Sequence, residues 1–275
     1  MMNSKLKRSL LFWLFLSPIV VVILFPYVVM TITSLKSATE VLNPTWWPEE
    51  LHWQNFSEMW QTSGIASALA NSLYVSTLST LLTIVVSIPA AYALSRYQFA
   101  GRNAYRQFLL VSQMLSPIVL VIGLFRLVAN AGMIDNLNVL VIIYTGFNIA
   151  FCVWMLQSYF STIPRDLEEA AWMEGANRWR TLRSVFLPLA VPAMVVTAIF
   201  TFINAWNEFV IALTMLRKEE NYTLPIRVLS LVAGRYTVDW HYVMAAAFVA
   251  SVPVAILFAW LQRYLVRGLS IGAVK

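Results

Sequence analysis

Six long apolar stretches, each sufficient to cross a lipid bilayer as a helix, constrain the fold of this 275-residue chain more than any other feature. A transmembrane helix needs about 20 predominantly apolar residues to cross roughly 30 Å of hydrocarbon. The stretches cover residues 10–32, 68–94, 107–129, 137–160, 189–216 and 242–265. Transmembrane strands are about half as long and alternate in polarity. The pattern therefore predicts an all-α integral membrane protein with six transmembrane helices.

The composition agrees with a membrane protein and argues against other classes. Hydrophobic residues make up 60% of the chain and charged residues 12%, whereas soluble domains contain roughly 45 to 50% and about 25%. The net charge of +6 arises from short clusters between the apolar stretches. No basic face results, so no nucleic-acid partner is expected. Cys152 is the single cysteine, and neither His52 nor His241 has a metal-binding spacing, so no metal site is expected.

The distribution of Lys and Arg predicts the orientation of the chain. Thirteen of the 19 Lys and Arg residues lie in the connections 95–106 and 161–188 and in the two terminal segments, counting Arg263 at the end of the last stretch with the C-terminal segment. Such an excess is typical of the cytoplasmic side, so both termini are expected in the cytoplasm. The sequence thus predicts one transmembrane domain over residues 1–275, with an outer loop at 33–67 and a cytoplasmic tail at 266–275. The first stretch lacks a small-residue cleavage site, which favours a retained helix over a removable signal peptide.

The connection at 161–188 has a pattern of its own, which predicts two short cytoplasmic helices separated by a break. Asp166 lies in the expected first turn, where a carboxylate suits the positive end of the helix dipole. Gly175 suits a left-handed C-terminal cap, and Asn177 can cap the second helix. Spacing alone leaves two interpretations open: a compact helix pair that projects from the membrane, or an amphipathic segment on the inner leaflet.

The same connection carries a family resemblance. It resembles the E-A-A-x3-G-x9-I-x-L-P loop of the permease subunits of ABC importers, with Val185 in place of the usual isoleucine. The matching residues are Glu169, Ala170, Ala171, Gly175, Leu187 and Pro188. Residues 48–56, 205–209 and 268–275 are similar to the carbohydrate-uptake branch of these permeases, in particular to the smaller permease of maltose-type transporters.

The resemblance implies a division of labour among several subunits. Two separate ATPase subunits would bind ATP, and the 169–175 helix would couple one of them to the membrane helices. A second homologous permease, an external solute-binding protein and a sugar are the other implied partners, in a bacterial cytoplasmic membrane. Gly268, Gly272 and Lys275 of the tail would lie at the ATPase interface. None of the nine glycines forms a phosphate-binding G-x-x-x-x-G-K-[ST] loop, so a non-catalytic subunit without its own cofactor is expected.

Polar residues within the spans are candidates for a substrate pathway, because such residues are costly in lipid. The candidates are Tyr144, Asn148, Asn204, Asn207 and Glu208. Asn204 and Glu208 share one helical face with Thr197 and Thr201. Burying the charge of Glu208 at the bilayer centre would cost about 2.5–3.5 kcal/mol, so it is expected to face water or a partner. The alternative is that these residues only bridge helices.

Three functions remain open at this stage. The resemblance favours a permease subunit that moves a mono- or oligosaccharide by alternating access. A permease for another solute, such as a polyol or glycerol phosphate, is the first alternative. An ion-coupled secondary transporter is the second, although a single intramembrane carboxylate gives it little support. A membrane enzyme would need a cluster of His, Asp, Glu or Cys residues, which the sequence does not show.

Overall fold

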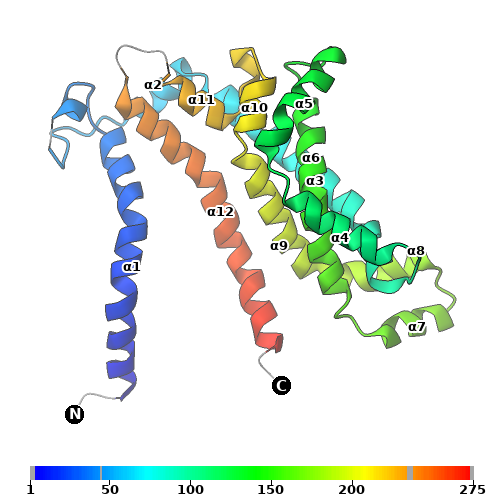
Figure 1. Cartoon of the computed structure of the whole chain (residues 1–275). Coiled ribbons are helices and arrows are strands. Elements are labelled where there is room, and N and C mark those ends of the chain that lie inside the picture. Colours follow the sequence, from blue (N-terminus) through cyan, green and yellow to red (C-terminus); the bar gives the residue numbers. More distant parts are fainter. Residues whose placement is uncertain (1–3, 44, 234–237, 273–275) are drawn as a thin grey trace. The chain divides into compact units, whose positions relative to one another are not determined.

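The structure, a computed structural model, describes residues 4–43, 45–233 and 238–272 (Figure 1). Every regular element in these ranges is a helix. The five long helices are α1 (Ser4–Ser34), α3 (Ile65–Arg96), α6 (Leu137–Phe160), α9 (Leu187–Trp206) and α12 (Trp240–Gly272). Five helices are long and apolar enough to cross a membrane, and a sixth span results if one bent pair is counted as one. The predicted all-α membrane fold is therefore confirmed.

Shorter helices fill the connections between the long ones. They are η1 (Glu40–Leu42), α2 (Gln54–Thr62), α4 (Arg102–Gln113), α5 (Pro117–Asn130), α7 (Arg165–Met173), α8 (Arg178–Thr181), η2 (Leu182–Phe186), α10 (Val210–Met215), η3 (Glu219–Asn221) and α11 (Leu224–Ser230). The η2 segment is a turn of π-helix. It ends two residues before Pro188, whose missing N–H cannot bond to the carbonyl four residues earlier.

The third predicted span is not one continuous helix. Helices α4 and α5 meet at an angle of 95°. Ser116 lies at the bend with φ −68° and ψ 130°, and Pro117 begins α5. The proline ring disfavours helical geometry in the residue before it, so the bend has a local cause that hydropathy does not register.

The fifth predicted span, residues 189–216, is also interrupted. Helix α9 ends at Trp206 and α10 begins at Val210. The prediction of a single helix through Glu208 was therefore wrong. A short break in a membrane helix is tolerated where protein groups pair with the freed backbone.

The chain divides into two compact units. The smaller comprises residues 1–66 and 227–252, and the larger residues 67–226 and 253–275. In the smaller unit, the Asn55 side chain donates to the carbonyl oxygens of Ser34 and Lys36, at 2.8 Å each. Phe56 packs edge-on against Phe248. These contacts attach α2 to the end of α1 and to α12.

In the larger unit, α6 packs against α9 and α4, and α5 packs against α10. Figure 1 shows α7 at the end of α6 that lies away from α5 and α10. One face of α3 buries small polar residues, which allow close approach of neighbouring helices. They are Ser72, Ser76, Ser79, Thr80, Thr83 and Ser87. Near α7, Phe160 and Phe186 are fully buried and pack edge-on, with ring centroids 5.6 Å apart.

Candidate functional site

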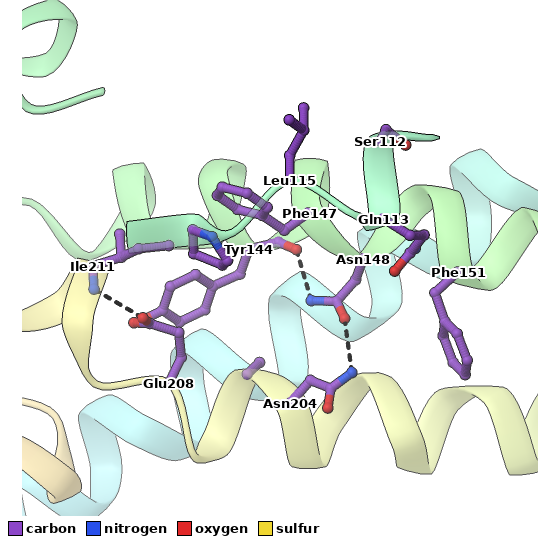
Figure 2. Close-up of a pocket in the computed structure, with 12 residues that line it drawn as sticks. Ser112, Gln113, Leu115, Tyr144, Phe147, Asn148, Phe151, Asn204, Glu208 and Ile211 are labelled. Carbon is purple, nitrogen blue, oxygen red and sulfur yellow. Dashed lines mark hydrogen bonds between the residues drawn. The ribbon is translucent and has the colours of Figure 1, made fainter. Parts of the chain in front are cut away.

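A cavity of about 250 Å³ opens in the larger unit, between the α4–α5 bend and the break between α9 and α10 (Figure 2). Its wall combines amide, hydroxyl and aromatic side chains with one carboxylate. The lining residues are Ser112, Gln113, Leu115, Pro117, Tyr144, Phe147, Asn148, Phe151, Asn204, Ala205, Glu208 and Ile211. The two interruptions that hydropathy did not predict therefore shape the site.

Glu208 lies in the break and binds the start of the helix that follows. Its Oε1 accepts the Ile211 N–H at 2.8 Å, and its Oε2 accepts the Ala212 N–H at 3.1 Å. The Tyr144 hydroxyl donates to the same Oε2 at 2.6 Å. The first N–H groups of a helix have no partner within it, so the carboxylate satisfies two of them and is itself stabilised. This explains how one carboxylate is accommodated within a span.

A chain of hydrogen bonds continues along the cavity from Tyr144 to α9. The Asn148 side chain donates to the Tyr144 carbonyl oxygen at 2.8 Å, and the Asn204 amide donates to Asn148 Oδ1 at 3.3 Å. Figure 2 shows these side chains on facing helices, with Asn204 across from Asn148. Asn148 is buried, whereas Asn204 is exposed. Asn204 therefore presents its amide to a solute in the cavity.

The structure brings four of the five predicted pathway residues to one cavity: Tyr144, Asn148, Asn204 and Glu208. Asn207 is exposed at the C-cap of α9 and does not line it. Thr197 and Thr201, placed on the same helical face, are fully buried within the helix packing instead.

Several wall residues were missed by the sequence reasoning. Phe147 and Phe151 flank Asn148 on α6 and supply flat apolar surface. Their spacing of four residues placed them on one helix face, but lipid-facing phenylalanines follow the same spacing. Periodicity therefore could not identify them as cavity residues.

The loop with the family resemblance forms the two predicted helices. Gly175 has φ +80°, which favours glycine. The Gly175 N–H bonds to the Trp172 carbonyl and the Ala176 N–H to the Ala171 carbonyl, at 2.9 Å each. These two bonds define a Schellman motif that ends α7. Asn177 accepts the Arg180 N–H and caps α8, so both predicted caps are confirmed.

Most of the motif residues point outward. Glu169, Ala170 and Gly175 are exposed, and Ala171 is half-buried. Large apolar side chains surround them, with exposed fractions up to 89% at Met173; they are Leu167, Trp172, Met173 and Trp179. Leu187 and Pro188 begin α9. An exposed apolar surface of this kind marks a membrane or protein contact.

The buried side of α7 depends on a residue that the motif does not include. Glu168 is 4% exposed; it accepts a hydrogen bond from the Tyr92 hydroxyl at 2.7 Å. Its other oxygen lies 3.4 Å from Arg96 Nε. In the C-terminal tail, Gly268 and Gly272 belong to the last turns of α12, and Lys275 lies outside the described residues. No group of three potential metal ligands occurs in the part of the chain that the structure describes.

Comparison with known proteins gives this architecture a family. Residues 83–271 match the family of binding-protein-dependent transport system inner membrane components. The DasC permease of the diacetylchitobiose uptake system of Streptomyces coelicolor is 31% identical over 276 residues, which cover 98% of this chain and 100% of the relative. The MalG permease of the trehalose/maltose transport system of Thermococcus litoralis is 33% identical over 257 residues, 93% and 92% of the two chains.

A solved structure shares the fold. A chain of a bacterial ABC transporter involved in the import of the acidic polysaccharide alginate superposes with a TM-score of 0.82. The match covers 96% of this chain and 98% of that one, at 22% sequence identity. This likeness concerns the fold.

The helical fold is the one found in that ABC transporter, and the sequence matches give the family. The chain belongs to the family of binding-protein-dependent transport system inner membrane components. It is a permease subunit of an ABC importer, a non-catalytic transport component that crosses the bacterial inner membrane several times.

Proposed function

We propose that this permease moves an uncharged mono- or oligosaccharide, and that the cavity around Asn204 is a contact site for it. The observation that carries the proposal is the chemistry of the wall. Asn204 and Gln113 present amides, while Phe147 and Phe151 present aromatic rings. Sugars combine hydroxyl groups with flat apolar faces, so amides and rings together match them. The sugar-uptake systems of the two relatives described above agree with this class of cargo.

The same wall argues against an anionic cargo such as glycerol phosphate. None of the described residues that line the cavity is cationic, whereas a cationic side chain is the strongest partner for the phosphate of glycerol phosphate or the carboxylate of an acidic sugar. Glu208 is the one charged lining residue, and its oxygens accept two backbone N–H groups and a tyrosine hydroxyl. That use as a helix cap removes the main support for an ion-coupled transporter.

The proposed assembly follows the family resemblance. A second homologous permease would complete the pathway, an external binding protein would deliver the sugar, and two ATPase subunits would bind ATP. Helix α7 would dock on one ATPase subunit through Glu169, Ala170 and Gly175, which are exposed. The thirteen Lys and Arg residues predicted on one side of the membrane favour cytoplasmic termini. In this arrangement the outer loop 33–67 lies on the opposite face, and the tail with Gly268, Gly272 and Lys275 lies near the ATPase subunits.

The cargo is tested with the complex that co-purifies with this chain, reconstituted in vesicles with ATP inside. Uptake of radiolabelled maltose, trehalose and diacetylchitobiose is compared with uptake of sorbitol and glycerol 3-phosphate. We expect uptake of at least one sugar and a reduction of about fivefold in Asn204→Ala, since one hydrogen bond contributes about 0.5–1.5 kcal/mol. Asn103→Ala, at an exposed asparagine outside the cavity, is the matched control. Uptake of glycerol 3-phosphate alone would refute the proposal.

The docking surface has its own test, which separates backbone shape from contact. Asparagine tolerates a positive φ whereas valine does not, so Gly175→Asn keeps the end of α7 and Gly175→Val disrupts it. We expect Gly175→Val and Glu169→Lys to lose the ATPase subunits during purification, and Gly175→Asn to retain them. Full retention in all three variants would show that this surface does not dock the ATPase.

A further inference from the structure

Helix α7 is attached to the rest of the protein through a carboxylate. Of its nine residues, all of which the structure describes, Glu168 alone is buried. The apolar side chains of Leu167, Trp172 and Met173 point outward instead. A surface helix normally packs through an apolar stripe. Helix α7 therefore exposes its large apolar side chains and contacts the rest of the protein through the carboxylate of Glu168.

Arg96, the partner of that carboxylate, lies on α3 and contacts three other segments. Its Nη2 donates to the carbonyl oxygens of Phe160 at 3.1 Å and Ile163 at 2.6 Å, at the end of α6. Its Nε lies 3.4 Å from Glu168 Oε2, an ion-pair contact longer than a well-directed hydrogen bond. Its guanidinium lies over the Phe186 ring, 4.7 Å from the centroid. Arg96 itself ends α3, where a cation suits the helix dipole.

The surroundings leave the pair little freedom to shift. Both side chains are 5% exposed. Tyr92, one turn before Arg96, donates to Glu168 Oε1 and packs its ring 4.8 Å from that of Phe186. Phe186 belongs to the π-helical turn that leads into α9. The ends of α3 and α6, the start of α9 and helix α7 are thus joined around one ion pair.

A buried ion pair is a weak source of stability, because desolvation offsets much of the attraction. Apolar side chains could hold α7 equally firmly. They could also slide, since hydrophobic contact has no direction. Here the Tyr92 hydroxyl holds the carboxylate and the Arg96 guanidinium holds two carbonyl groups through directed hydrogen bonds. The arrangement therefore suits a joint that must transmit displacement.

We propose that Arg96, Glu168 and Tyr92 are positioning residues that carry movement of α7 into α3, α6 and α9. The proposal rests on the docking of α7 to an ATPase subunit. Helices α6 and α9 continue from this joint to the cavity, where they carry Asn148 and Asn204. From Phe160 to Asn148 the distance along α6 is about 18 Å at 1.5 Å per residue. The joint and the cavity are therefore connected by two stiff helices.

The test reads movement at the cavity without requiring knowledge of the cargo. Cys152 is the only cysteine in the chain and is buried, so Gln113→Cys, at an exposed position on the cavity wall, provides one reactive thiol in this chain. Its rate of maleimide labelling is measured in the purified complex with and without the ATP analogue AMP-PNP. Retention of the ATPase subunits is measured in the same samples.

The variants are Glu168→Gln, Tyr92→Phe and the double variant Arg96→Met/Glu168→Met. We expect AMP-PNP to change the labelling rate about tenfold in the parent, within the usual range of coupling between sites. The change should fall below about twofold in Glu168→Gln and in the double variant, and Tyr92→Phe should be intermediate. Glu220→Gln is the matched control, because Glu220 pairs with Lys218 while both side chains are largely exposed.

Each outcome decides the question. A double variant that assembles and keeps the full response would show that the ion pair only stabilises the loop, and would overturn the proposal. If Glu168→Gln does not assemble, the labelling response is measured in the double variant and in Tyr92→Phe instead. If neither of these assembles, the three residues have a purely structural role and the proposal fails. The docking proposal is tested separately by Gly175→Val. If Gly175→Val loses the ATPase subunits while the ion-pair variants retain them, docking by α7 holds, and the labelling result then concerns only the ion pair.

Discussion

Two glutamates of the larger unit, Glu168 and Glu208, are held by different means. Each accepts a tyrosine hydroxyl, from Tyr92 at 2.7 Å and from Tyr144 at 2.6 Å. Glu168 is completed by the guanidinium of Arg96. Glu208 is completed by two backbone N–H groups at the start of α10. The Glu168 carboxylate joins helices that are far apart in the sequence. The Glu208 carboxylate pairs with backbone N–H groups at the break between the consecutive helices α9 and α10.

The difference shows how each region can respond to force. An arginine on another helix makes the position of α7 depend on α3 and α6. Backbone N–H groups only three and four residues away make the Glu208 contact local, so that it can persist while the surrounding helices move. The Glu168–Arg96 pair is therefore suited to transmit movement between helices. The contact of Glu208 with backbone N–H groups is suited to keep the shape of the cavity.

The largest effect is expected from Arg96→Met, which leaves the Glu168 carboxylate buried without its cation. Removing one partner of a buried ion pair costs about 3–5 kcal/mol, and both side chains are nearly inaccessible to solvent. Unfolding in mixed micelles with increasing sodium dodecyl sulfate measures the loss. The double variant Arg96→Met/Glu168→Met should recover most of it. If Arg96→Met is as stable as the parent, the ion pair does not hold Glu168, and the proposed difference between Glu168 and Glu208 is refuted.

The next effect is expected from Glu208→Gln. The amide has one acceptor oxygen where the carboxylate has two, so a donor among Ile211, Ala212 and Tyr144 loses its partner. An unsatisfied donor costs about 1–3 kcal/mol. Because the contact is local, hydrogen exchange should accelerate at the backbone amides of α10 and remain unchanged in α7. Acceleration in both helices would mean that the two carboxylates are energetically linked.

A matched pair of substitutions compares the two hydroxyls directly. Tyr92→Phe should cost about 1.5–3 kcal/mol, as for a bond to a buried charge, and Tyr144→Phe about 0.5–1.5 kcal/mol. The second value is smaller because Glu208 is only half-buried beside the cavity, where water can replace the hydroxyl. Denaturation of both variants under one condition measures the difference. Equal losses would argue that burial does not distinguish the two sites.

The smallest effect concerns Asp135, a carboxylate between α5 and α6 that also accepts backbone N–H groups. Burial alone would raise its pKa, but the N–H groups of Arg217 and Lys218, at 3.0 and 3.1 Å, hold the pKa below its ordinary value. The stabilisation is therefore present above the pKa of the unfolded chain, about 3.9. It is lost as the pH falls through the lower folded pKa. Proteolysis of the 216–222 connection should increase below about pH 4 in the parent.

Asp135→Asn provides the control for this prediction. Asparagine tolerates the φ of +65° found at this position but does not titrate in this range. Its cleavage rate, corrected for the pH dependence of the protease, should not change with pH. An identical pH response in parent and variant would assign the effect to another group.

Much of the fold could be predicted because its signals are local. The stretch 137–160 coincides with α6, since an uninterrupted apolar run requires no information beyond itself. Gly175 and Asn177 were predicted as caps because a positive φ and an unpaired N–H are properties of one turn. The breaks at Ser116 and Asn207 were missed, although Pro117 was a visible signal for the first.

The candidate site was predicted in part, and the errors share one cause. Hydropathy and helical spacing selected Tyr144, Asn148, Asn204 and Glu208, but the same spacing also selected Thr197 and Thr201, which are buried elsewhere. The motif directed attention to Glu169, whereas the adjacent Glu168 proved to be the buried one. Two neighbouring glutamates look alike in sequence, and only the position of Arg96 distinguishes them.

The sequence by itself determined that this chain crosses a membrane as helices, which apolar stretches contribute to them, and where α7 ends and α8 begins. These properties follow from the cost of apolar surface in water and from hydrogen bonds within a few residues. The tertiary structure decided that Glu168 pairs with the guanidinium of Arg96 and that Glu208 accepts the hydroxyl of Tyr144. The contacts of Glu168 with Arg96 and of Glu208 with Tyr144 bring together residues 72 and 64 positions apart, and only the packing of helices sets such distances.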